Sequence, residues 1–96
     1  MNEEELRFIK QWILKAEEDL LVVHQLLKAD TPVTGIIGFH CQQASEKFLK
    51  ALLLYHKIDV VKTHNIEYLL EKCSKIDNSF SSIDPGNLTD YGVEMR

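Results

Sequence analysis

The chain has 96 residues, of which 45% are hydrophobic and 27% are charged, and its formal net charge is −4. This length fits one domain, and the composition is that of a globular protein rather than a disordered one. The acidic balance argues against a broad basic surface for non-specific nucleic-acid binding, although residues 31–62 are locally basic. We therefore expect one folded domain over residues 1–96.

No stretch has the features of a secretion signal or a membrane span. The chain begins Met-Asn-Glu-Glu-Glu, without the basic and apolar segments of a signal peptide. The longest run without charge, residues 31–45, contains Thr, Gln, His and Ser and cannot be a transmembrane helix. Cys41 and Cys73 form no CxxC pair. We therefore expect a cytoplasmic protein in a reducing compartment, with no membrane partner.

Apolar residues recur at steps of three and four over residues 4–29, which predicts a long first helix with one buried stripe. The stripe consists of Leu6, Ile9, Ile13, Ala16, Leu20, Val23 and Leu27. Glu17, Glu18 and Asp19 are expected on its solvent side. The helix is expected to end at residues 30–32, because a residue before proline disfavours the helical conformation.

A second helix is predicted up to about residue 56, with Thr31 or Thr34 as its cap. Its core stripe is predicted at Ile37, Cys41, Ala44, Phe48, Ala51 and Tyr55. Phe39, Leu49 and Leu53 project from roughly the opposite side. A helix that is apolar on two sides is either central in a bundle or shared with a partner. We therefore expect a homodimer or a higher oligomer.

The rest of the chain predicts shorter elements. Residues 57–62 form a connection whose apolar side chains are expected to pack under the bundle. A third helix is predicted at about 64–76, capped by Thr63. Residues 77–87 are rich in Asn, Ser, Asp, Pro and Gly, which indicates a loop with at most a short turn, and a last short helix is predicted over 88–96. Because strand-like alternation is absent, the predicted fold is all-α, a small antiparallel up-and-down bundle.

Polar side chains follow one flank of the second helix at His40, Gln43, Lys47 and Lys50. A histidine, an amide and two ammonium groups in a row suit a phosphate or a nucleotide. The alternative is a boundary face on which lysines extend to solvent and His40 bonds a neighbouring helix. His64 opens the third predicted helix, where a helix N-terminus favours an anion; alternatively it is a surface or capping residue.

Metal and cofactor chemistry is not predicted. A zinc site would need Cys41 and Cys73 with His40 or His64, but both thiols lie on apolar faces. Neighbouring residues of a helix also point about 100° apart, which separates His40 from Cys41 and opposes a shared metal. The chain contains no GxGxxG, Walker A, HExxH or GxSxG motif. We expect no metal and no cofactor.

Four sequence blocks resemble the HEPN domain family. Residues 40–53, His-Cys-Gln-Gln-Ala-Ser-Glu-Lys-Phe-Leu-Lys-Ala-Leu-Leu, resemble its second helix, with the pattern Gln-Gln-Ala-x-Glu-Lys-x-Leu-Lys-Ala. Residues 12–20 are similar to its first-helix signature, Lys-Ala-x-x-Asp-Leu. Residues 62–66 are similar to its Thr-His-(Asp/Asn)-hydrophobic helix start, and residues 88–91 to the segment before its Arg-Tyr-Pro signature. The blocks follow the family order over nearly the whole chain.

The resemblance implies an antiparallel helical bundle that is usually dimeric and often encoded with a minimal nucleotidyltransferase. Many members are ribonucleases or toxins, and others are non-catalytic nucleotide-binding or assembly partners. The nucleases share an Arg followed after four to six residues by a His. No His follows Arg7 or Arg96 at that spacing, so no catalytic residue is assigned. The family also has a further helix beyond the Arg, and we expect that last helix to be missing here.

Together these features predict a non-catalytic, dimeric module that binds a nucleotide, a nucleotidyltransferase partner or both, in a toxin–antitoxin type of system. The candidate phosphate-binding residues are His40, Gln43, Lys47, Lys50, His64 and Arg96. Two alternatives stay open. One is a metal-independent endoribonuclease toxin, or a fragment of one, with RNA as the ligand. The other is a purely structural helical dimerisation module.

Overall fold

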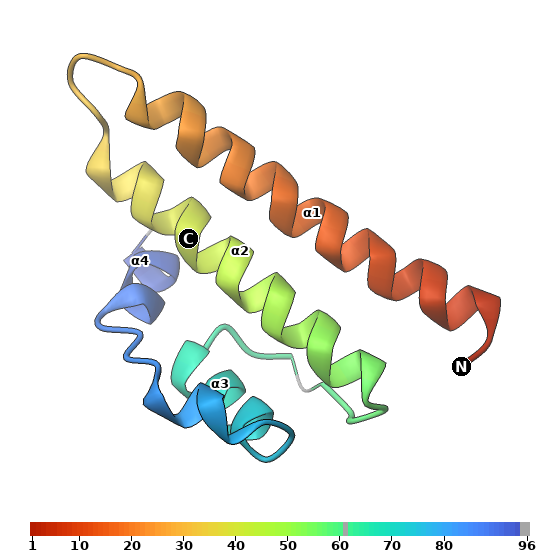
Figure 1. Cartoon of the computed structure of the whole chain (residues 1–96). Helices are drawn as coiled ribbons and strands as arrows, with labels where there is room; N and C mark the ends of the chain where they lie inside the picture. Colours follow the sequence, from red (N-terminus) through yellow and green to blue (C-terminus); the bar gives the residue numbers. More distant parts are fainter. Residues whose placement is uncertain (61, 95–96) are drawn as a thin grey trace.

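Two long antiparallel helices form the frame of the molecule (Figure 1). α1 covers Glu3–Leu27 and α2 covers Thr34–Tyr55. The shorter elements are α3 (Ile66–Ser74), the 3-10 helix η1 (Asn78–Ser82) and α4 (Leu88–Glu94). The computed structural model describes residues 1–60 and 62–94, and it contains no β-strand within these ranges. The all-α antiparallel bundle predicted from the sequence is confirmed.

α1 buries a narrower stripe than its periodicity predicts. The helix begins after Asn2, whose Oδ1 accepts a hydrogen bond from the backbone N–H of Glu5 at 2.7 Å. The apolar side chains that it buries are Ile9, Ala16 and Val23. Leu6, Leu20 and Leu27 of the predicted stripe are exposed instead. The reason is that α2 is the only described helix that packs on α1.

α2 is the central helix, with α1 on one side and α3 and α4 on the other (Figure 1). The main apolar cluster joins Leu49 and Leu53 of α2 to Ile66, Leu69, Leu70 and Cys73 of α3. Ala44 and Ala51 are buried as well. Phe48 and Tyr55, predicted as core residues, are 37% and 56% exposed because they lie on a flank that no described helix covers. The two-sided apolar character of α2 therefore reflects its central position.

The predicted helix caps differ from the observed ones. α2 begins after Val33, which makes no side-chain cap bond, so neither predicted threonine caps it. α3 begins later than predicted, because Asn65 and not Thr63 is its N-cap. Asn65 Oδ1 accepts from the N–H of Tyr68 at 2.8 Å, while Thr63 Oγ1 accepts from the N–H of Asn65 at 3.1 Å. Thr63 therefore shapes the turn before the helix.

α4 connects the end of the described chain to α2 and α3. A Cβ atom added at Gly38 would lie 2.4 Å from a ring carbon of Tyr91, so α4 approaches α2 where only glycine fits. Thr89 Oγ1 accepts from the N–H of Ile66 at 3.0 Å and donates to Glu67 Oε2 at 2.8 Å. These two bonds join α4 to the first turn of α3.

The connecting segments agree largely with the sequence-based expectations. Ile58 and Val60 pack against the main cluster, and η1 lies where a short turn was expected. The expected packing of Val61 and the expected place of Met95 in the last helix lie outside the described residues. Among the residues that are described, no helix combines the length and the apolarity that crossing a membrane requires.

Candidate functional site

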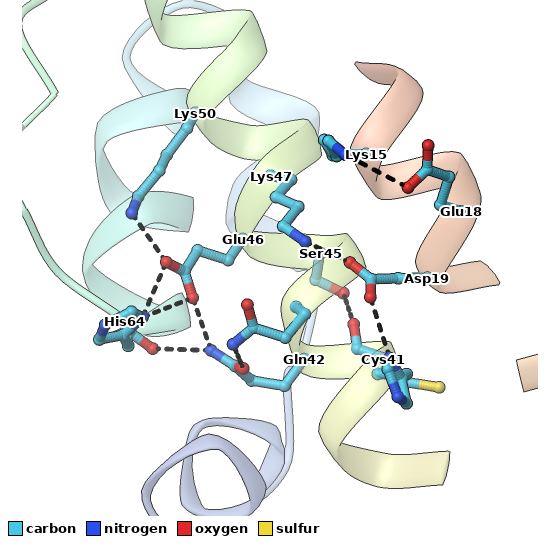
Figure 2. Close-up of polar contacts among 12 residues, drawn as sticks. Lys15, Glu18, Asp19, Cys41, Gln42, Ser45, Glu46, Lys47, Lys50 and His64 are labelled. Atoms are coloured by element: carbon cyan, nitrogen blue, oxygen red, sulfur yellow. Dashed lines mark hydrogen bonds and ion pairs between the residues drawn. The ribbon is translucent and has the colours of Figure 1, made fainter. Parts of the chain in front are cut away.

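Two buried carboxylates organise the polar contacts of α2. Asp19 of α1 is 8% exposed and Glu46 of α2 is 4% exposed. Asp19 was expected on the solvent side of α1, and this expectation is wrong. A carboxylate removed from water is stable only with cationic and hydrogen-bonding partners. Figure 2 shows that each of the two carboxylates has such partners.

The first cluster joins α1 to α2 through Asp19. Lys47 Nζ donates to Asp19 Oδ2 at 2.6 Å, and His40 Nδ1 donates to Asp19 Oδ1 at 2.9 Å. An ionised carboxylate only accepts, so the Nδ1 atom of His40 carries the proton. The side chains of His40 and Lys47 are 25% and 23% exposed. His40 therefore bonds the neighbouring helix, which was the alternative to a phosphate-binding role.

The second cluster is centred on Glu46 and is more deeply buried. Lys50 Nζ donates to Glu46 Oε1 at 2.7 Å, and Gln42 Nε2 donates to Glu46 Oε2 at 2.8 Å. His64 Nδ1 lies 2.8 and 2.9 Å from the two carboxylate oxygens. Gln42 Nε2 also donates to the carbonyl of His64 at 3.2 Å. Through these bonds α2 holds the segment that precedes α3 (Figure 2).

The pKa of Glu46 shows which of its interactions dominate. Burial acts to raise the pKa of this carboxyl group. Hydrogen bonds from Lys50, His64 and Gln42, together with the positive charge of Lys50, outweigh burial and hold the pKa below its ordinary value. Glu46 is therefore a carboxylate at neutral pH, and its negative charge compensates the ammonium group of Lys50.

The structure divides the predicted phosphate-binding flank of α2 between these clusters. His40 and Lys47 bond Asp19, whereas Lys50 bonds Glu46. Gln43 Nε2 donates to the side-chain oxygen of its neighbour Gln42 at 2.7 Å and so continues the second cluster. Each cationic group on this flank thus has a carboxylate in contact. A phosphate would have to displace that carboxylate or bind beside its negative charge.

His64 lies near the second cluster but not at a helix N-terminus. It precedes the cap residue of α3, and its side chain is 41% exposed. The first turn of α3 is already supplied with acceptors, since Thr89 accepts from its first N–H and Asn65 from its third. An anion at this helix start would compete with both. The last candidate, Arg96, lies outside the described residues.

A separate cavity of about 250 Å³ opens beside the second cluster. Its lining residues are Phe8, Trp12, Lys50, Leu54, Val60 and Lys62. Lys50 Nζ lies 5.6 Å from the ring centroid of Trp12, within cation–π range. Phe8 meets Trp12 edge to face, with ring centroids 6.2 Å apart. Lys62 is exposed, and no ion pair joins it to another described residue.

Reasoning from the sequence did not identify three buried polar residues that organise these contacts, namely Asp19, Gln42 and Glu46. One signal for them was present in the helical spacing, because Gln42, Glu46 and Lys50 recur every four residues and therefore meet on one face. Another signal was the motif context. Asp19 is the acid of the Lys-Ala-x-x-Asp-Leu block, and Glu46 is the acid of the Gln-Gln-Ala-x-Glu-Lys block.

The described residues offer no alternative centre of metal or thiol chemistry. Within residues 1–60 and 62–94 no group of three or more His, Cys, Asp or Glu side chains is arranged to hold a metal ion. Burial raises the pKa of the Cys41 and Cys73 thiols, which disfavours their reactive thiolate forms. Cys73 Sγ donates to the carbonyl of Leu49 at 3.7 Å. We therefore interpret Cys73 as a packing residue of α3.

Comparison with known proteins gives one positive result. The model of the HEPN domain family matches residues 9–94. The match covers most of α1 and the whole of α2, α3 and α4. Comparisons with curated proteins and with solved structures found no significant match.

Proposed function

The chain belongs to the HEPN domain family, and on that premise we propose that it is a non-catalytic assembly module. In this proposal it forms a homodimer or a higher oligomer and binds a further protein subunit. A nucleotidyltransferase, in a toxin–antitoxin type of system, is the partner class that the family resemblance implies. The supporting observation is the extent of exposed apolar surface on the two long helices.

The uncharged flank of α2, which we define as Cys41, Ser45, Phe48, Leu52 and Tyr55, is one part of this surface. Phe48 lies between two cavities of about 230 and 370 Å³, the first lined also by Ile13 and Tyr55 and the second by Ile83 and Leu88. The charged groups of α2 are all elsewhere, in contact with Asp19 or within the Glu46 cluster. Depletion of charge and enrichment of aromatic side chains are typical of interface centres.

The arrangement of the histidines supports the non-catalytic part of the proposal. Both His40 and His64 direct Nδ1 at a buried carboxylate that links two segments of the fold. No histidine follows Arg7 at the spacing that the nuclease members use. The polar groups therefore have a structural task, which is to connect α1 to α2 and α2 to the start of α3.

Light scattering at micromolar concentration tests the assembly directly. We expect a mass of at least twice the 11.1 kDa of the chain. Phe48→Glu, which places a charge in the middle of the uncharged flank, is the companion variant. If this flank binds a different protein, the variant keeps its oligomeric state and loses that protein. A stable monomer of the wild type at these concentrations would overturn the proposed self-association.

Nucleotide binding is the second candidate function, and the cavity beside Trp12 is the observation that favours it. The cavity combines aromatic side chains with the ammonium group of Lys62, which forms no ion pair with another described residue, and base stacking with a phosphate contact needs both. Trp12 is the only tryptophan of the chain, and it also lines a second cavity with Gln11, Leu14 and Lys15, so its fluorescence reports on both cavities and the Lys62 variant distinguishes them. We expect AMP or GMP to quench it, with weaker binding in Lys62→Ala and unchanged binding in Lys28→Ala.

If Lys47→Ala loses the quenching of Trp12 and Lys62→Ala keeps it, the nucleotide site lies instead on the flank of α2 that was predicted from the sequence. Fluorescence that stays constant with millimolar AMP and GMP would remove the nucleotide candidate and leave the assembly function alone.

A further inference from the structure

Leucine side chains lie along one flank and the outer side of α1. They occupy two rows with seven-residue spacing, Leu6, Ile13, Leu20 and Leu27 in one and Leu14 and Leu21 in the other. Leu14, Leu21 and Leu27 are 54%, 59% and 55% exposed, and Leu6 and Leu20 are 38% and 37% exposed. α2 is the only described helix that packs on α1, and of these residues Ile13 faces a cavity that it shares with α2, so the exposed leucines have no cover within the described chain. Such a row is typical of a helix that packs on another helix.

A row of charged and titratable residues lies between the two leucine rows. It consists of Glu3, Lys10, Glu17 and His24, again seven residues apart and all exposed. No ion pair joins any of the four to another described residue. Acidic and basic types alternate along the row. Seven residues are close to two helical turns, so the row runs along one face of α1.

This alternation is self-complementary when two copies of α1 lie antiparallel. With the centre of symmetry between Ile13 and Leu14, Lys10 lies opposite the partner's Glu17. Glu3 lies opposite the partner's His24, and a two-fold axis repeats both pairs. A parallel alignment would instead place each residue opposite its own copy, with like charges in contact. The alternating charges therefore favour a second copy of α1 as the partner and an antiparallel orientation of the two helices.

The leucine rows fit the same alignment. The two-fold axis keeps each row on its own side of the charged row, so Ile13 lies near the partner's Ile13, Leu14 near the partner's Leu14 and Leu6 near the partner's Leu20. Apolar contacts therefore lie on both sides of the row of charge pairs. One choice of centre satisfies the apolar and the charged positions together.

We propose that the outer face of α1 binds the α1 of a second copy of this chain, antiparallel, around reciprocal Lys10–Glu17 ion pairs. This rests on the proposed self-association and names its surface and geometry. It leaves the uncharged flank of α2 accessible to a different protein. The dimer would therefore carry two such flanks, one on each copy.

Charge reversal tests the geometry. Lys10→Glu and Glu17→Lys each replace two attractive contacts by two repulsive ones, and we expect each variant to dimerise roughly 10-fold or more weakly than the wild type. The double variant Lys10→Glu/Glu17→Lys restores both pairs in swapped form and should dimerise within about 3-fold of the wild type. Sedimentation equilibrium measures all three dissociation constants, and circular dichroism checks that the helices persist.

Mixing the two single variants gives a second readout. One copy then carries two acidic groups at these positions and the other carries two basic groups, so the mixture should form a heterodimer although each variant alone is weakened. The matched control is Lys15→Glu/Glu18→Lys, which reverses an exposed 3.6 Å pair on another side of the same helix. We expect the control to dimerise like the wild type.

A monomeric wild type would overturn the proposed self-association and this surface with it. A dimer that tolerates both single reversals would overturn this surface alone, and a loss of dimerisation in Phe48→Glu would then assign the contact to the flank of α2. Failure of the double variant or of the mixture to associate would show that the two residues do not face each other.

Discussion

Glu46→Gln is the sharpest test of how the buried polar cluster stabilises the fold. The substitution preserves the size of the side chain but removes the charge that pairs with Lys50 Nζ at 2.7 Å. Lys50 is 6% exposed, so its ammonium group has little access to water in the folded protein. The cation–π contact with Trp12, at 5.6 Å, remains but does not replace a carboxylate.

The expected loss is large relative to the stability of such a chain. Removing one partner of a buried ion pair costs about 3–5 kcal/mol, and the lower end applies because the glutamine oxygen still accepts hydrogen bonds. At about 0.05–0.15 kcal/mol per residue, a domain of this length is stable by roughly 5–14 kcal/mol. A loss of about 3 kcal/mol corresponds to a fall in Tm of roughly 12–24 °C.

Urea and thermal unfolding at pH 7, followed by circular dichroism, measure this loss. Glu18→Gln is the matched control, because it removes the same charge from an exposed pair with Lys15, and we expect a change below about 0.5 kcal/mol. The double variant Glu46→Gln/Lys50→Met should recover part of the loss, since no buried charge is left uncompensated. If Glu46→Gln costs no more than Glu18→Gln, the account of this cluster is refuted.

Acid unfolding provides an independent measurement on the same residue. Because the pKa of Glu46 is lowered in the folded protein, its contribution to stability is present above the ordinary carboxyl pKa. The contribution is lost as the pH falls through the lower, folded-state pKa. The difference in stability between wild type and Glu46→Gln should therefore narrow below about pH 4.5. A difference that stays constant down to pH 3 would contradict this assignment.

Three further predictions concern other parts of the fold and its activity. Asp19→Asn should lower the free energy of unfolding by about 1–3 kcal/mol. This loss should be smaller than that of Glu46→Gln, because His40 and Lys47, which pair with Asp19, are partly exposed. An equal loss in the two variants would contradict this ranking. Gly38→Ala should cost about 1–3 kcal/mol by displacing Tyr91, whereas Gly35→Ala, which has open space around it, should be neutral or stabilising. The purified chain should leave single-stranded RNA intact in EDTA, and cleavage that persists after further purification would restore the ribonuclease alternative.

The sequence predicted the order of the helices because their apolar periods are long and few residues interrupt them. The sequence did not show which apolar face of α2 contacts which neighbouring helix. Phe48 and Ala44 belong to the same stripe by spacing, but only Ala44 is buried. Burial depends on where a neighbouring helix crosses, and one helix's periodicity does not contain that information. Ala51 and Phe48 line the same cavity against Ile9 of α1, yet Ala51 is 3% exposed and Phe48 is 37% exposed.

The candidate phosphate-binding residues were chosen from their spacing on one helix, and that spacing did not include their partners on other segments. Spacing placed His40 and Lys47 on one flank, and the structure does bring them together. It does so around Asp19, which is 21 and 28 residues earlier in the chain. A cation's compensating partner is a tertiary contact, so a list of cations on one helix overestimates the positive charge available to a ligand.

The dependence of α1 on a single neighbour has a consequence for local unfolding. α1 can separate from α2 while α3 and α4 stay packed on the Leu53–Leu69 cluster. Such an opening exposes Ile9 and Val23 and breaks the bonds of Asp19, but it leaves the Glu46 cluster with Gln42 and His64 intact. The amide hydrogens of α1 should therefore exchange with solvent through a smaller opening free energy than those of α3, and the bundle should open from this helix first.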